Sequence, residues 1–205
     1  CHCFFPADGW IGLTAFGRSI PIWVILAYVV FYGGFTYLIA LAFRNGISRR
    51  TLWGSIAVWG ALNLAMEIPL LQSGLYLYYG DQPLTVGGFP ISQLVFNTLG
   101  SMLGAVVIVR LAWFFTGARQ LLLTVVPFAT FMSSWVVGMP FFLVLNNDTS
   151  HGLRVLAALV SIAIGLVAID VLIRLGTGQL RLLPPTDGAT PEAVGRRQPA
   201  LSNKT

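Results

Sequence analysis

The residue with the clearest capacity for chemistry is Glu67, a carboxyl group inside a long apolar run. It belongs to the segment NLAMEIPLLQSGLYLYYGDQPLTVGGFP, residues 63–90. A charged side chain at membrane depth is costly unless it is paired or faces water, so such residues commonly mark a functional site. A carboxyl group in apolar surroundings favours its neutral form and can then serve as a general acid. The alternative is a structural carboxyl group that bonds to a neighbouring helix.

Two asparagines accompany this carboxyl group. Asn63 precedes Glu67 by four residues, which places both on one face of a helix. There it can orient the carboxyl group or bind a substrate oxygen. Asn97 lies in the next apolar run, at a similar expected depth, so we predict that Asn97 and Glu67 line one cavity. The alternative for either amide is a hydrogen bond between helices.

An aromatic and polar segment follows Glu67 along the chain. Tyr76 and Tyr79 would share one face of a continuing helix, and each can donate a hydrogen bond or stabilise a cation through its ring. Asp81, Gln82 and Phe89 lie just beyond, and we predict that they bind substrate at the mouth of the cavity. The alternative is an aromatic belt at the membrane surface followed by a turn.

The composition defines the class of protein. Of the 205 residues 56% are hydrophobic and only 9% are charged, whereas soluble domains have about 25% charged residues. We therefore predict an integral membrane protein whose partners are the lipid bilayer and an apolar small molecule. The net charge of +5 comes from short basic clusters between apolar runs, which favours membrane topology over nucleic-acid binding. No metal-binding or nucleotide-binding motif is present, so no metal and no cofactor are predicted.

The apolar runs predict an all-α polytopic membrane helix bundle with five transmembrane helices, each of about 20 residues. The predicted spans are 21–43, 51–77, 91–115, 120–145 and 153–175. Residues 1–19 would form an outer N-terminal segment, residues 20–176 the bundle, and residues 177–205 a disordered tail. The chain begins at Cys1 rather than Met, so we expect further membrane segments upstream. The sequence does not indicate an oligomeric state.

The basic residues predict the orientation in the cytoplasmic membrane. Arg44, Arg49 and Arg50 lie in the loop after the first span, on the same side as the basic tail. The positive-inside rule therefore places the C-terminus inside and the Tyr76–Gln82 loop outside. Asp170 and Arg174 are four residues apart and should form an ion pair, with Arg110 as an alternative partner for the aspartate.

Residues 67–100, EIPLLQSGLYLYYGDQPLTVGGFPISQLVFNTLG, resemble the signature region of the AveC-type spirocyclase family of actinobacterial membrane proteins. The matching positions are Gly74, Leu75, Tyr76, Tyr78, Tyr79, Gly80, Gln82, Pro83, Gly88, Phe89, Pro90, Asn97 and Gly100. The resemblance implies that the chain forms spiroketals, and also dehydrates, polyketide-like molecules without a cofactor.

The implied roles agree with the residues already singled out. Glu67 would supply the acid, Asn63 and Asn97 would hold oxygens, and Tyr76 or Tyr79 would support an oxocarbenium ion. Two alternatives remain open at this stage. One is a membrane cyclase or hydratase of isoprenoids or carotenoids, and the other is a non-enzymatic transporter or scaffold bundle.

Overall fold

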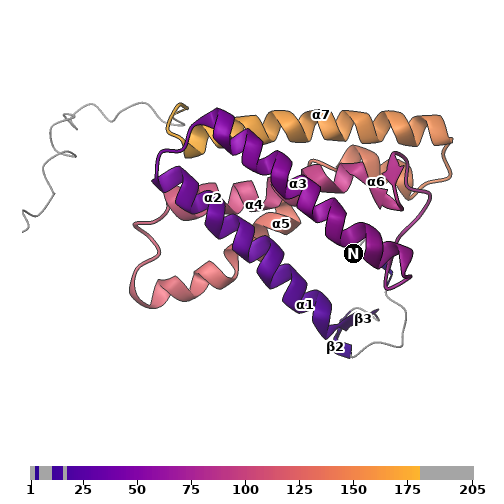
Figure 1. The fold of residues 1–205 in the computed structure, drawn as a ribbon, viewed down its shortest axis with the longest axis horizontal. Helices are drawn as coiled ribbons and strands as arrows, with labels where there is room; N and C mark the ends of the chain where they lie inside the picture. The colour runs from indigo at the N-terminus through magenta and orange to yellow at the C-terminus, as the bar shows by residue number, and fades with distance from the viewer. Residues whose placement is uncertain (1–2, 5–10, 16–17, 181–205) are drawn as a thin grey trace, which may run out of the picture.

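The computed structural model describes residues 3–4, 11–15 and 18–180 of the chain. Within these residues the fold is an all-α membrane helix bundle (Figure 1), as the sequence predicted. Of the predicted disordered tail, residues 181–205 lie outside the described residues.

Four helices are long and apolar enough to cross a membrane. They span Ile22–Arg44, Arg49–Gln72, Ile91–Arg110 and His151–Gly176. The first consists of α1 (Ile22–Tyr28), a π-helical segment η1 (Val29–Gly33) and α2 (Gly34–Arg44), and the other three are α3, α4 and α7. Four of the five predicted spans are therefore continuous helical rods.

The fourth predicted span, residues 120–145, is not a straight helix. A 3-10 helix (Gly117–Thr124) precedes α5 (Val126–Ser134) and α6 (Met139–Leu145), and the last two meet at 63°. Pro127 and Pro140 each lie in the first turn of their helix, where a proline starts a helix but cannot continue one. The bent pair counts as a fifth span only if both helices cross together.

The second and third predicted spans are each too long at their C-terminal end. Helix α4 ends at Arg110 rather than Phe115. Helix α3 ends at Gln72 rather than Leu77, because Gly74 adopts the left-handed conformation with φ +72°. The amide of Gly74 donates to the Leu71 carbonyl and that of Leu75 to the Leu70 carbonyl, which is the Schellman ending of a helix. The chain therefore turns back soon after Glu67.

Short antiparallel strand pairs lie at this end of the bundle. They are β1 (Cys3–Phe4) with β4 (Leu77–Tyr78), β2 (Ile11–Ala15) with β3 (Arg18–Pro21), and β5 (Thr85–Val86) with β6 (Phe89–Pro90). The β5–β6 hairpin leads directly into α4, so α3 and α4 are joined by a compact reversal of the chain.

Helix α4 lies at the centre of the bundle and packs against α2, α5 and α7. Its approach to α5 is close because two glycines face that helix. A Cβ atom on Gly100 would lie 2.8 Å from the backbone Cα of Phe131, and one on Gly104 would lie 2.9 Å from Thr130 Oγ1. Small residues four apart commonly allow membrane helices to pack backbone to backbone.

An ion-pair cluster joins α3 to α7 at one end of the bundle. Asp170 lies 2.6 Å from Arg49 Nη2 and 2.9 Å from Arg174 Nε, so the predicted Asp170–Arg174 pair is present. Trp53 Nε1 also donates to Asp170, at 3.4 Å. Arg110 does not bind Asp170 but donates to the carbonyl of Leu175.

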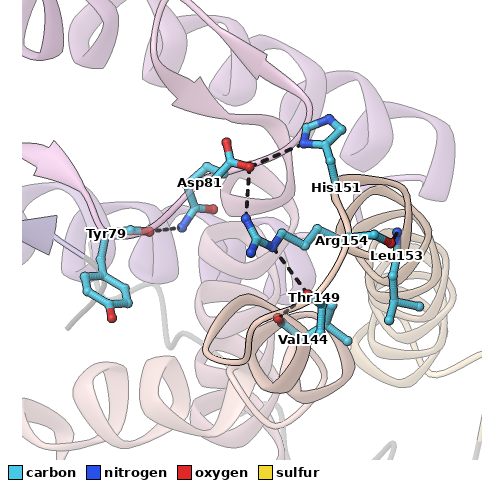
Figure 2. Close-up of polar contacts among 9 residues, drawn as sticks. Tyr79, Asp81, Val144, Thr149, His151, Leu153 and Arg154 are labelled. Carbon is cyan, nitrogen blue, oxygen red and sulfur yellow. Dashed lines mark hydrogen bonds and ion pairs between the residues drawn. The ribbon is translucent and has the colours of Figure 1, made fainter.

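A second polar cluster fixes the α3–α4 connection at the other end (Figure 2). Asp81 Oδ2 lies 2.9 Å from Arg154 Nη1 and 3.4 Å from His151 Nδ1, both on the first turn of α7. Arg154 also donates to Thr149 Oγ1 at 3.3 Å. The loop is therefore held on the α6–α7 junction rather than left free in solvent.

We predict that Gly100→Ala lowers the free energy of unfolding by about 1–3 kcal/mol, the usual cost of overpacking. The reason is that the added methyl group meets the backbone of α5, which cannot move aside alone. The matched control is Gly54→Ala on α3, where a Cβ atom would meet nothing within 4 Å and alanine favours the helix. Thermal unfolding in detergent measures both, and equal melting temperatures for the two variants would contradict the packing argument.

Candidate functional site

Glu67 and Asn63 project from one face of α3 and contact each other directly. Asn63 is 3% exposed, and its Nδ2 donates to Glu67 Oε1 at 2.7 Å. Asn97 Nδ2 on α4 donates to Asn63 Oδ1 at 3.3 Å. The two amides therefore form a chain of hydrogen bonds that runs from α4 to the carboxyl group and orients it.

Two tyrosines hold the other oxygen of Glu67. The hydroxyl groups of Tyr76 and Tyr78 both donate to Oε2, that of Tyr78 at 2.9 Å. These residues follow the end of α3, and Tyr78 belongs to β4. In extended chain, alternate side chains point the same way, which is why residues 76 and 78 act together. Both carboxyl oxygens are thus fixed by hydrogen-bond donors.

The carboxyl group faces a cavity of about 110 Å³ between α1, α3, α4 and α5. Nine of the lining side chains are aromatic, and the polar ones gather around Glu67. The aromatic residues are Trp23, Tyr28, Phe31, Tyr32, Trp59, Tyr76, Tyr78, Phe131 and Trp135. Such a lining is mostly apolar and presents the faces and edges of aromatic rings to a ligand.

Aromatic pairs join the α1–α2 rod to α3 and to the segment that follows α3. Trp59 stacks on Phe35 with 4.2 Å between ring centroids and contacts Phe31 at 4.7 Å. Trp23 lies 6.2 Å from Tyr76. The two helical rods diverge from the loop that joins them (Figure 1), and residues of both rods line the cavity.

A second aromatic wall comes from α5. Phe131 lies 4.2 Å from Tyr32, 5.6 Å from Tyr28 and 5.7 Å from Trp135 between ring centroids. Because Gly100 lets the backbone of α5 approach α4 closely, Phe131 is brought deep into the bundle. The same helix contact that organises the core therefore shapes the cavity.

The structure brings four of the five predicted catalytic residues together, namely Glu67, Asn63, Asn97 and Tyr76. Tyr79 does not join them. Its side chain is 53% exposed, it does not line the cavity, and its backbone carbonyl accepts from Gln82 Nε2 (Figure 2). The expected pairing of Tyr76 with Tyr79 assumed a helical period that ends at Gly74.

The three predicted substrate-binding residues lie outside this cavity. Asp81 is bound to Arg154, and Gln82 to the Tyr79 carbonyl. Both line a second pocket of about 320 Å³ at the surface of the loop. Phe89 has no exposed surface and packs with Leu71 and Tyr76, so it supports the tyrosine that binds Glu67.

Two residues of the site were missed from the sequence. Tyr78 contacts Glu67 and also lines the outer pocket, so it forms the wall between the two spaces. Gln93 lies one turn before Asn97 on α4, is 4% exposed and lines the Glu67 cavity. The four-residue spacing of Gln93 and Asn97 was the available signal.

Within the described part of the chain, no three His, Cys, Asp or Glu side chains are grouped as they would be to bind a metal. The polar groups of the cavity are one carboxyl group, amides and phenols. They can exchange a proton with a ligand and form hydrogen bonds to its oxygens.

Comparisons of the chain with protein-family models, with curated proteins and with solved structures found no match.

Proposed function

We propose that this chain is a membrane-embedded spirocyclase-like enzyme that closes an apolar, polyketide-like dihydroxy ketone to a spiroketal. The observation that carries the proposal is a carboxyl group fixed by three donors inside an aromatic cavity of a membrane protein. A purely structural carboxyl group would be expected to join helices at a packed contact rather than face open space. The resemblance of residues 67–100 to AveC-type proteins supports the same reading.

Acid–base catalysis is sufficient for this reaction, because no step transfers electrons to or from the protein. One hydroxyl group adds to the ketone carbon, and a proton moves to the former carbonyl oxygen to give a hemiketal. Protonation of the hemiketal hydroxyl group by Glu67 releases water and leaves an oxocarbenium ion. The second hydroxyl group then attacks that carbon and returns its proton to Glu67. The balance is one dihydroxy ketone converted to one spiroketal and one water.

The cavity suits each requirement of this reaction. Glu67 with its tyrosine donors carries the proton that is transferred. The ring faces of the lining aromatic residues stabilise the positive charge of the oxocarbenium ion. The amide chain from Asn97 through Asn63 holds the carboxyl group in position, which lowers the entropic part of the barrier.

The size of the cavity limits how much of a substrate it can enclose. Its volume of about 110 Å³ is below the range of about 300–1,000 Å³ that encloses a whole drug-sized ligand. We therefore infer that the cavity takes the reacting centre while the apolar remainder extends between α1 and α3 toward the bilayer. In the proposed orientation the C-terminus is on the cytoplasmic side of the membrane. The end of α3 that carries Glu67 is then nearer the outer face.

The aromatic lining also favours a second candidate, a proton-initiated cyclase or hydratase of isoprenoids or carotenoids. The same carboxyl group would protonate an alkene or epoxide, and the rings would stabilise a carbocation. The two candidates differ in their products, since only spiroketal formation releases water from an oxygenated precursor.

We expect Glu67→Gln to reduce turnover by about 10²–10⁴-fold, the usual contribution of general acid catalysis. Gln keeps the shape but cannot deliver a proton. The assay uses the purified protein in liposomes with a long-chain dihydroxy ketone, and follows spiroketal by mass spectrometry at neutral pH against protein-free liposomes. Glu67→Asp should retain part of the activity because the acid remains.

Near-wild-type turnover of Glu67→Gln, at matched amounts of folded protein, would remove Glu67 from the mechanism. A lower melting temperature with unchanged turnover per folded molecule would identify Glu67 as a structural carboxyl group instead.

Tyr78→Phe and Tyr79→Phe form a matched pair that tests the geometry. The first removes a hydroxyl group that donates to Glu67, and the second removes one from an exposed side chain that does not line the cavity. A hydrogen bond to a charged group contributes about 1.5–3 kcal/mol, so Tyr78→Phe should lower kcat by roughly 10–100-fold. Tyr79→Phe should stay within about twofold of wild type. Equal effects in the same liposome assay would exclude the assigned role of Tyr78.

A further inference from the structure

Gln93 lines the cavity but takes no part in the hydrogen-bond network around Glu67. Its side chain is 4% exposed, and its Nε2 makes no hydrogen bond to any residue in the described part of the chain. A buried amide donor without a partner costs about 1–3 kcal/mol. Such groups are rare in folded proteins and call for an explanation. A ligand in the cavity that accepts this hydrogen bond supplies one.

The position of Gln93 relative to Glu67 follows from the register of α3 and α4. The contact of Asn97 with Asn63 sets that register, and the two helices run in opposite directions because a hairpin joins them. Four residues back along α4 lead to Gln93, and four residues forward along α3 lead to Glu67. Each step is about 6 Å along the helix axis, so the two side chains lie at the same level on adjoining walls.

We propose that Gln93 is a substrate-binding residue whose side-chain amide donates to a hydroxyl or ether oxygen of an oxygenated apolar ligand. This inference rests on the proposed function, since the same ligand presents its reacting oxygen to Glu67. The ligand class is thereby narrowed to apolar molecules with at least two oxygens near the reacting carbon, one for each wall.

In this arrangement Gln93 also influences which diastereomer of the spiroketal forms. A planar oxocarbenium carbon can be attacked on either face, and a second fixed oxygen decides which face meets the incoming hydroxyl group. With Glu67 on α3 and Gln93 on α4, the ligand is held at two points, one on each of two adjoining helices. Loss of the second point lets the ring system rotate, so both spiroketal diastereomers form.

The test compares wild type with Gln93→Met, which keeps the length of the side chain but removes both polar atoms. The matched control is Gln120→Met, an exposed position on the 3-10 helix outside the cavity. Two probes are used in lipid nanodiscs, a long-chain dihydroxy ketone and its deoxy analogue, in which both hydroxyl groups are replaced by hydrogen and the ketone is kept. Calorimetry gives the Kd of each probe, and thermal unfolding gives the Tm of ligand-free protein.

Gln93→Met should bind the dihydroxy ketone about tenfold more weakly than wild type, the equivalent of one hydrogen bond. Its affinity for the deoxy analogue, which lacks the oxygens that Gln93 would bind, should be unchanged. The Tm of the ligand-free variant should equal or exceed that of wild type, because an unpartnered buried donor has been removed. The spiroketal formed by the variant should be a mixture of diastereomers.

Equal loss of affinity for both probes, or a fall in Tm, would identify Gln93 as a structural residue and overturn the inference. Unchanged affinity of Gln93→Met for the dihydroxy ketone, or a wild-type protein that does not prefer the dihydroxy ketone over its deoxy analogue, would also overturn it. The proposed function fails separately: dihydroxy ketone bound in a Gln93-dependent way but never converted would retain the binding role and reject the enzyme.

Discussion

The constraint on which this structure depends is that a carboxyl group inside an apolar bundle must be supplied with hydrogen-bond donors. Glu67 obtains one from its own helix, through Asn63, and two from beyond the end of that helix, through Tyr76 and Tyr78. The need for donors from beyond the end of α3 determines the path of the chain. Helix α3 has to stop within two turns of Glu67, and Gly74 allows this because it adopts a positive φ without strain. The chain can then return in extended form along the cavity.

The returning segment is short and polar, so other parts of the fold hold it in place. Phe89 packs beneath Tyr76, with no surface exposed. Asp81 fixes the outer part of the loop to Arg154 on α7. Exposed ion pairs contribute little to overall stability, so the value of this contact lies in position rather than in free energy. A loop that shifted by a few ångströms would withdraw Tyr78 from Glu67 and open the wall between the two pockets.

The parts of the fold that were predictable from the sequence are those that depend on local composition. Apolar runs identified α3, α4 and α7 because about 20 apolar residues suffice to define a span. Hydropathy does not indicate whether an apolar run forms a straight or a bent helix. The bend between α5 and α6 was therefore not predicted, although Pro140 lies in the run. Asn63 and Glu67 were found through their spacing on one helix. Tyr78 was missed because the helical period was continued past Gly74. Gln93 was missed because the rotation of α4 about its axis depends on packing, in which Gly100 and Gly104 take part.

The π-helical segment in the first membrane helix has a consequence for how such a cavity can change. A π turn holds one residue more than an α turn, so Val29–Gly33 offsets the faces of α1 and α2 relative to a regular helix. If the same residues were wound as a regular α-helix, α1 would rotate by about 100°, while Phe35 and Ile39 on α2 stayed in the core. Trp23 and Tyr28 would then turn away from Glu67, and a different set of side chains would face the ligand. The winding of this one segment, without any change in the residues of the wall, therefore determines which side chains of α1 face the ligand.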